Sequence, residues 1–149
     1  MHIGYRAALF IADRATVDRH TGGLNLLNAG WSVTALAPGQ GIVFSLGAIV
    51  DVPWDRCNIS IPITLTLMTD DRSAVLDAQG RPITISQAIK VNARPGAPNG
   101  AGGVGTMLVE FPAPGLVLEP RNHYHWVASI DGQTNDQWQV TFWVDSPHE

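Results

Sequence analysis

Two histidines near the C-terminal end of the sequence are its clearest candidate for chemistry. His123 and His125 are two positions apart in a run that alternates polar and apolar residues, so in a β-strand both imidazoles project from one face. Such a pair can chelate a divalent metal, but a metal site needs a third and usually a fourth ligand. There is no second spaced His or Cys pair, and the other histidines, His2, His20 and His148, lie near the ends or in a turn. We therefore favour a solvated sheet face and predict no metal and no cofactor.

A glycine-rich segment matches a dinucleotide-binding pattern. Gly100, Gly102 and Gly105 fit G-x-G-x-x-G letter for letter. The pattern holds a pyrophosphate only where a strand enters the glycine turn and a helix leaves it. Here the segment that follows, TMLVEFP, has the composition of a strand. We interpret residues 94–103, RPGAPNGAGG, as an exposed loop between two strands.

The carboxylate residues and the single cysteine do not form a recognisable metal site or catalytic site either. Asp70, Asp71 and Asp77 flank an expected hairpin, but their segment lacks the D-x-D-x-D-G spacing of a calcium loop, and aspartate also favours tight turns. Cys57 is alone in the chain, so no internal disulfide can form, and it fits a small buried residue better than a nucleophile. The sequence has no G-x-S-x-G elbow, no H-E-x-x-H and no P-loop. We predict that the protein is not an enzyme.

The five tryptophans favour binding over catalysis. Three of them fall on or near the buried side of their expected strands, whereas Trp143 falls on the outer face beside Thr141 and Gln139. An exposed indole is unfavourable in water unless a second sheet region, a sugar or a protein partner covers it. Indoles are also common anchors of protein interfaces. Trp143 is therefore a candidate contact residue.

Regular alternation of apolar and polar residues predicts the strands that position these side chains. In the clearest run, residues 59–68, the five odd-numbered positions are apolar and face one way. Pro62 lies in this run and lacks the amide hydrogen that a central ladder needs, so we expect the strand at a sheet edge or at a bulge. Further strands are expected at residues 3–11, 24–27, 31–36, 42–52, 83–91, 104–111, 124–130 and 138–144.

These strands define the expected fold class. The strand at 42–52 has apolar residues on both faces and should be covered, at least in part, on both sides. Turns are expected at 112–115 and 131–137, and short helical turns are conceivable at 13–20 and 53–58. Eight or nine short strands without long helices predict an all-β, single-domain antiparallel two-sheet β-sandwich, immunoglobulin-like or C2-like.

Length and charge narrow the classes of partner. A chain of 149 residues has room for one ordinary domain, residues 1–149. Nine Lys and Arg against 13 Asp and Glu give a formal charge of -4, which argues against nucleic acid or a membrane surface as partner. The first residues lack the features of a secretion signal, and no stretch approaches 18 apolar residues.

Three segments of the sequence resemble a known family. They are ALFIADRATVDRHTGGLNLLNAGW, AIVDVPWDRCN and PGLVLEPRNHYHWVASIDG, and together they are similar to an uncharacterised family of small β-sandwich domains from actinobacteria and their phages, a domain of unknown function. The motifs are the Gly-Leu-Asn-Leu-Leu segment before Gly30-Trp31, the Val52-Pro53-Trp54 turn followed by Asn58, and the closing hairpin. The resemblance implies a fold and a source, and it lends no site residues.

From these features we expect a non-enzymatic virion protein, a capsid-decorating or tail-associated subunit that docks to capsid or tail proteins and could form homo-oligomers. Trp143, Pro62 and the loop at 94–103 are the expected contacts. The location would be the virion, or otherwise the cytoplasm, because no signal peptide or transmembrane segment is evident. The alternative is a module that binds carbohydrate or another small ligand through Trp143 and Trp54. A metal enzyme using His123 and His125 is a third alternative.

Overall fold

The computed structural model describes residues 4–30, 32–37, 39–93 and 102–146, which form strands joined by turns and one short 3₁₀ turn. The elements are β1 Arg6–Ala12, β2 Arg14–Val17, β3 Leu24–Leu27, β4 Val33–Ala35, β5 Gly41–Val52, η1 Trp54–Arg56, β6 Ser60–Thr69, β7 Thr84–Lys90, β8 Gly103–Val117, β9 Asn122–Ile130 and β10 Gln133–Asp145. The predicted all-β class is confirmed, with ten strands among these residues instead of eight or nine. The same residues contain no helix long and apolar enough to cross a membrane.

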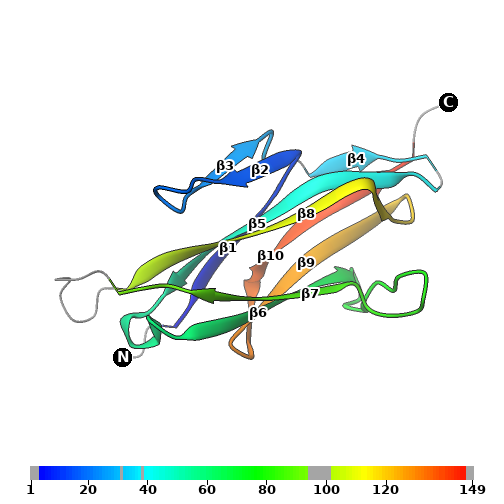
Figure 1. Cartoon of the computed structure of the whole chain (residues 1–149). Coiled ribbons are helices and arrows are strands. Elements are labelled where there is room, and N and C mark those ends of the chain that lie inside the picture. The colour runs from blue at the N-terminus through cyan, green and yellow to red at the C-terminus, as the bar shows by residue number, and fades with distance from the viewer. Residues whose placement is uncertain (1–3, 31, 38, 94–101, 147–149) are drawn as a thin grey trace.

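The strands form three sheets, of which the two larger ones pack against each other as in a β-sandwich (Figure 1). The three-stranded sheet has the order β1-β5-β8, the five-stranded sheet has the order β4-β10-β9-β6-β7, and β2 pairs with β3 in a separate hairpin. All strand pairs are antiparallel except β4 and β10, which are parallel. The expectation of a purely antiparallel arrangement is wrong for β4, which pairs in parallel with β10 at the edge of the five-stranded sheet. The two strands are far apart in the sequence, so no tight hairpin requires them to be antiparallel.

The hydrophobic core lies between the two larger sheets. Alternation along each strand turns every second side chain inward, as the sequence predicted. The largest fully buried side chains come from both sheets: Phe44, Leu46, Val50 and Val52 of β5, Ile61, Ile63, Leu65 and Leu67 of β6, Trp126 and Ile130 of β9, Phe142 of β10 and Ile11 of β1. The Phe44 and Phe111 rings stack with centroids 4.6 Å apart. Burying each such side chain contributes about 1.5–3 kcal/mol, so this core is what holds the sheets together.

The β2–β3 hairpin covers the outer side of the three-stranded sheet. Leu24 packs so closely on Gly47 of β5 that a Cβ at Gly47 would lie 3.2 Å from Leu24 Cδ1. Ser45 of β5 is also buried, which confirms that this strand is covered on both sides over part of its length. The helical turn considered at 13–20 is wrong, because residues 14–17 are the strand β2, in which Ala15 pairs with Leu26 and is buried.

The expectation that the strand of Pro62 lies at a sheet edge or at a bulge is wrong. Strand β6 lies between β9 and β7, its pairing with both is regular, and β7 is the edge strand. The carbonyl oxygen of Pro62 accepts a hydrogen bond from the amide of Asp131, just past Ile63 and Ile130, where pairing with β9 begins. Because the proline nitrogen faces this end of the ladder, its missing hydrogen costs one terminal bond at most.

Two turns also differ from expectation, and one agrees. Residues 112–115 continue β8, because its last residues pair with Gly41 and Ile42 of β5 across an irregularity in register; Gly115 there has φ +84°. The turn expected at 131–137 is shorter, with β10 beginning at Gln133 and a register shift between Thr134 and Gln139. The short helical turn at 53–58 is confirmed as η1.

Two glycines of the dinucleotide-like pattern, Gly102 and Gly105, together with Gly103 beside them, allow close packing; Gly100 lies outside the described residues. A strand, β8, follows them and no helix does, as the sequence predicted. A Cβ at Gly103 would lie 2.4 Å from Val91 Cγ1, and one at Gly105 would lie 2.8 Å from Val91 Cγ2. Gly103 and Gly105 therefore let the start of β8 approach the β7 side of the other sheet. Of the predicted exposed loop, residues 94–101 lie outside the described part of the chain.

Candidate binding surface

The side of the five-stranded sheet that faces away from the core carries mostly polar side chains, a few small or apolar ones and the indole of Trp143. We call it the outer face and define it by the outward positions of four strands: Gln139, Thr141 and Trp143 of β10, His123, His125, Val127 and Ser129 of β9, Pro62, Thr64, Thr66 and Met68 of β6, and Thr84, Ser86, Ala88 and Lys90 of β7. The antiparallel register places these positions in cross-strand rows. The result is a broad surface on regular, paired backbone.

Trp143 lies in a cross-strand row at one end of the outer face. Its register neighbours are Val33 of β4 and His123 of β9. The Trp143 and His123 rings meet edge to face with centroids 4.6 Å apart. The backbone amide of Trp143 donates to the carbonyl oxygen of Ser32 at 2.7 Å, and Val33 remains 59% exposed. The sequence correctly predicted the outer face for Trp143, and the side chain is half-buried there.

A carboxylate bridges the two histidines. Asp70 Oδ1 lies 2.6 Å from His125 Nε2, and Asp70 Oδ2 lies 3.4 Å from His123 Nδ1. The other ring nitrogen of His125, Nδ1, lies 2.7 Å from the Thr141 hydroxyl. The hydrogen bond to His125 is the main cause that holds the pKa of Asp70 below its usual value; burial opposes this shift, and His123 adds to it. The His125 ring is therefore fixed from both sides.

The turn after β6 positions Asp70. The amide of Arg72 donates to the Thr69 carbonyl, and the amide of Thr69 donates to the Ser73 carbonyl, so the turn closes on its own backbone. Asp71 accepts hydrogen bonds from the Thr69 hydroxyl and the Ser73 amide, which lower its pKa. Arg72 reaches across to Gln139 of β10 at 2.8 Å. The turn therefore bends over the outer face and places the Asp70 carboxylate beside His123 and His125.

The acidic residues considered for calcium have turn roles, apart from Asp70. Asp71 stabilises the turn just described, and Asp77 accepts from the amides of Gln79 and Arg81, which lowers the Asp77 pKa. Within residues 4–30, 32–37, 39–93 and 102–146, no group of three or more His, Cys, Asp or Glu side chains has the arrangement of a metal site. Both ring nitrogens of His125 are already engaged, so the cluster is a hydrogen-bonded network.

The structure places the two predicted contact residues on one surface. Trp143 and Pro62 both belong to the outer face, near its opposite ends, and Pro62 is exposed. Cys57 is buried, with its thiol 3.6 Å from the Pro53 carbonyl oxygen, which fits the structural interpretation of this residue. Sequence reasoning missed that Asp70 pairs with the histidines. No local signal could have revealed it, since the contact depends on β6 pairing with β9.

A second polar cluster ties together the opposite end of the sandwich. The Tyr5 hydroxyl donates to Asp131 Oδ2 at 3.0 Å, and the Arg56 guanidinium lies 4.0 Å from the same carboxylate. Burial of the ring, followed by the hydrogen bond to Asp131, raises the pKa of Tyr5 to about 12. These contacts join the segment before β1, the η1 turn and the β9–β10 hairpin.

The sequence was compared with family models and with curated proteins, and neither comparison found a match.

Proposed function

We propose that this protein is a non-enzymatic interaction protein that docks to other protein subunits through its outer face. The observation that carries the proposal is the position of Trp143, half-buried between Val33 and His123 on a regular sheet. A rigid indole held by its neighbours loses little conformational freedom on binding, and tryptophan is enriched among the residues that dominate binding energy.

The surroundings of Trp143 suit a protein interface. The hydroxyls of Thr64, Thr66 and Ser129 supply hydrogen-bonding groups over the rest of the face, and the Asp70–His125 pair lies beside the indole row. An apolar anchor with a polar surround is the usual anatomy of such surfaces. The docked partner would cover Trp143 and Val33, which water contacts in the free protein.

The size of the face favours a weak contact that is repeated. The four strands of the outer face, spaced at about 4.8 Å and with about seven residues each at about 3.3 Å, give roughly 450 Å² of flat surface. A stable pairwise complex buries about 800 Å² on each partner. A contact of this size is therefore modest by itself, and many copies in one assembly would multiply it.

With the family resemblance described above, we extend the proposal to one kind of assembly, a bacteriophage virion. The chain would be a capsid-decorating or tail-associated subunit, bound to capsid or tail proteins. Its acidic charge of -4 fits a protein surface as partner better than the packaged nucleic acid.

The test measures incorporation into particles. Particles purified from a phage that encodes the chain should contain it in fixed proportion, as measured by quantitative mass spectrometry. Trp143→Ala should reduce incorporation by about tenfold or more, the typical effect of truncating an interface tryptophan. Trp54→Ala, which removes an exposed indole that is not part of the outer face, is the matched control and should leave incorporation unchanged.

Two results would refute the proposal. Absence of the chain from native particles would remove the virion assignment. Wild-type incorporation of a folded Trp143→Ala variant would remove the outer face as the docking surface.

A further inference from the structure

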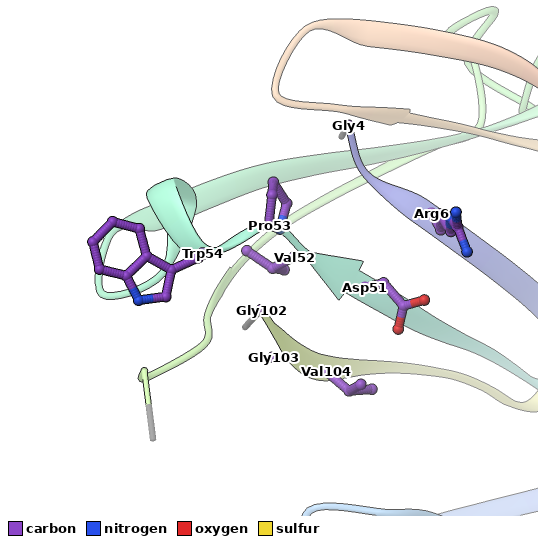
Figure 2. A pocket seen from close by; sticks show the side chains of 9 residues that line it. All are labelled: Gly4, Arg6, Asp51, Val52, Pro53, Trp54, Gly102, Gly103 and Val104. Atoms are coloured by element: carbon purple, nitrogen blue, oxygen red, sulfur yellow. The ribbon is translucent and has the colours of Figure 1, made fainter. Parts of the chain in front are cut away.

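A hollow at one end of the three-stranded sheet lies apart from the outer face (Figure 2). It opens where β5 ends, β8 begins and the chain enters β1, and its volume is about 350 Å³. Sites for small molecules in proteins begin at about 300 Å³, so the hollow admits a small ligand. It shares no residue with the outer face.

Two of the residues that line this hollow, Gly102 and Gly103, are glycines in close contact with their neighbours. A Cβ at Gly102 would lie 2.2 Å from the carbonyl oxygen of Val52, and a Cβ at Gly103 would collide with Val91. Gly102 cannot carry a side chain without a shift of the Val52 backbone, and Gly103 cannot without displacing the Val91 side chain. Val52 and Pro53 complete an apolar floor beside this glycine backbone.

An exposed indole forms one side of the hollow. Trp54 is 43% exposed and lies at the start of η1, and Figure 2 shows its ring at one end of the site. The turn that carries it is fixed, because the amide of Cys57 donates to the Trp54 carbonyl, Cys57 is buried, and the amide of Asn58 donates to the Val91 carbonyl. The ring is thus presented to solvent by a held backbone.

A pair of opposite charges forms the other side. Arg6 of β1 and Asp51 of β5 are register partners, with Val104 of β8 next in the row and 61% exposed (Figure 2). Within the described residues, neither the Arg6 nor the Asp51 side chain makes an ion pair or a hydrogen bond. The β2–β3 hairpin stops one row earlier, where the Thr106 hydroxyl donates to the Gly22 carbonyl, so it leaves this row uncovered.

The two charges select the chemistry of the ligand. A guanidinium only donates hydrogen bonds and a carboxylate only accepts them, so together they match a group that does both. Vicinal hydroxyls are such a group. An anion such as phosphate would be attracted to Arg6 and repelled by Asp51, and the neutral sum of the pair favours a neutral ligand.

We propose that this hollow binds a neutral saccharide, with one sugar ring stacked on Trp54 and hydroxyls bonded to Asp51 and Arg6. Aromatic rings with apolar faces suit the C–H face of a sugar, and the adjacent charged pair gives the bound ring its orientation. The site goes beyond the proposed docking function and is independent of it, because it uses other residues at another place in the fold.

The test titrates the protein with four neutral disaccharides, maltose, cellobiose, lactose and chitobiose, by isothermal calorimetry and by NMR shifts of the indole signals. At least one sugar should bind saturably with Kd near 1 mM, a typical affinity for a small open site, in titrations to about 10 mM. Trp54→Ala and Asp51→Asn should each weaken binding about tenfold. Trp143→Ala is the matched control and should bind as the wild type does.

Folding of the variants is checked first by circular dichroism; η1 buries no residue, so Trp54→Ala should fold. Absence of saturable binding by all four sugars overturns the proposal. Equal binding by Trp54→Ala, or loss with Trp143→Ala instead, overturns the site. A response of Trp54 to triarginine and to none of the sugars would show a cation over the indole, which also overturns it. None of these outcomes depends on whether particles incorporate the protein.

Discussion

Substitution of Gly103 by alanine tests how the two larger sheets close against each other. The added Cβ would lie 2.4 Å from Val91 Cγ1, and the next atoms are 3.9 Å away. Val91 is 7% exposed and belongs to the core. A β-branched side chain in a packed core has few rotamers, so Val91 cannot turn aside without displacing its neighbours.

The magnitude follows from two opposing effects. Overpacking costs about 1–3 kcal/mol, and alanine in place of glycine in a strand returns about 0.5–1 kcal/mol. We therefore expect Gly103→Ala to lose about 1–2 kcal/mol of unfolding free energy. Val91→Ala alone should lose about 2 kcal/mol, because two buried carbons are removed and a cavity is left.

The double variant separates this contact from general damage. With Val91 truncated, the alanine at 103 no longer collides and fills part of the cavity, so the pair should lose only about 1–1.5 kcal/mol. Simple addition would give about 3–4 kcal/mol, so the expected coupling is about 2 kcal/mol. The measurement is urea unfolding followed by tryptophan fluorescence for all four proteins.

The control for this series is Gly4→Ala. No atom lies within 4 Å of a Cβ built at Gly4, so its stability should stay within about 0.5 kcal/mol of the wild type. A Gly103→Ala protein as stable as the wild type would refute the close approach of β8 to Val91. Additive losses in the double variant would refute it equally.

Three further predictions concern contacts described above. Tyr5→Phe removes the hydrogen bond to Asp131 and should lose about 1 kcal/mol of unfolding free energy at neutral pH. Because the pKa of Tyr5 is raised from 10.0 to about 12, the stability of the wild type should fall between pH 10 and 12 more steeply than that of the variant. Parallel curves of stability against pH would contradict this. Asp70→Asn should be less stable than the wild type at neutral pH. Because the pKa of Asp70 is lowered from 3.8, the difference in unfolding free energy between the two proteins should shrink as the pH falls below that value. A difference that persists in acid would exclude the carboxylate as its cause. Pro62→Ala should change the unfolding free energy by less than about 0.5 kcal/mol. Thr64→Pro puts a proline inside the β6–β9 ladder and should lose about 3 kcal/mol or more. Equal effects of the two substitutions in thermal unfolding would refute the position of Pro62 at the end of the ladder.

Several features of the fold could be read from neighbouring residues alone. The strand at 24–27 was placed correctly to the residue, and the outward position of Trp143 followed from alternation. The turn predicted at 112–115 was wrong. Pro112 and Gly115 are typical turn residues, yet their backbone continues along β5 across an irregularity in register. Local chemistry is a weak guide wherever a long partner strand fixes the backbone.

The candidate site was visible only in pieces. The two histidines, Trp143 and Pro62 could each be singled out, but their common surface requires the strand order β10-β9-β6. The Asp70 bridge and the Arg6–Asp51 pair were missed, since each joins residues far apart in the chain.

The sequence by itself determined the class of structure and the face of each strand, because a side-chain period of two is a local property of extended backbone. Tertiary structure alone decided which strands are neighbours, that β4 runs parallel to β10, and that Asp70 meets the histidines. Alternation is the same whichever strand lies alongside, so the choice of partner depends on how the whole set of apolar faces packs into one core.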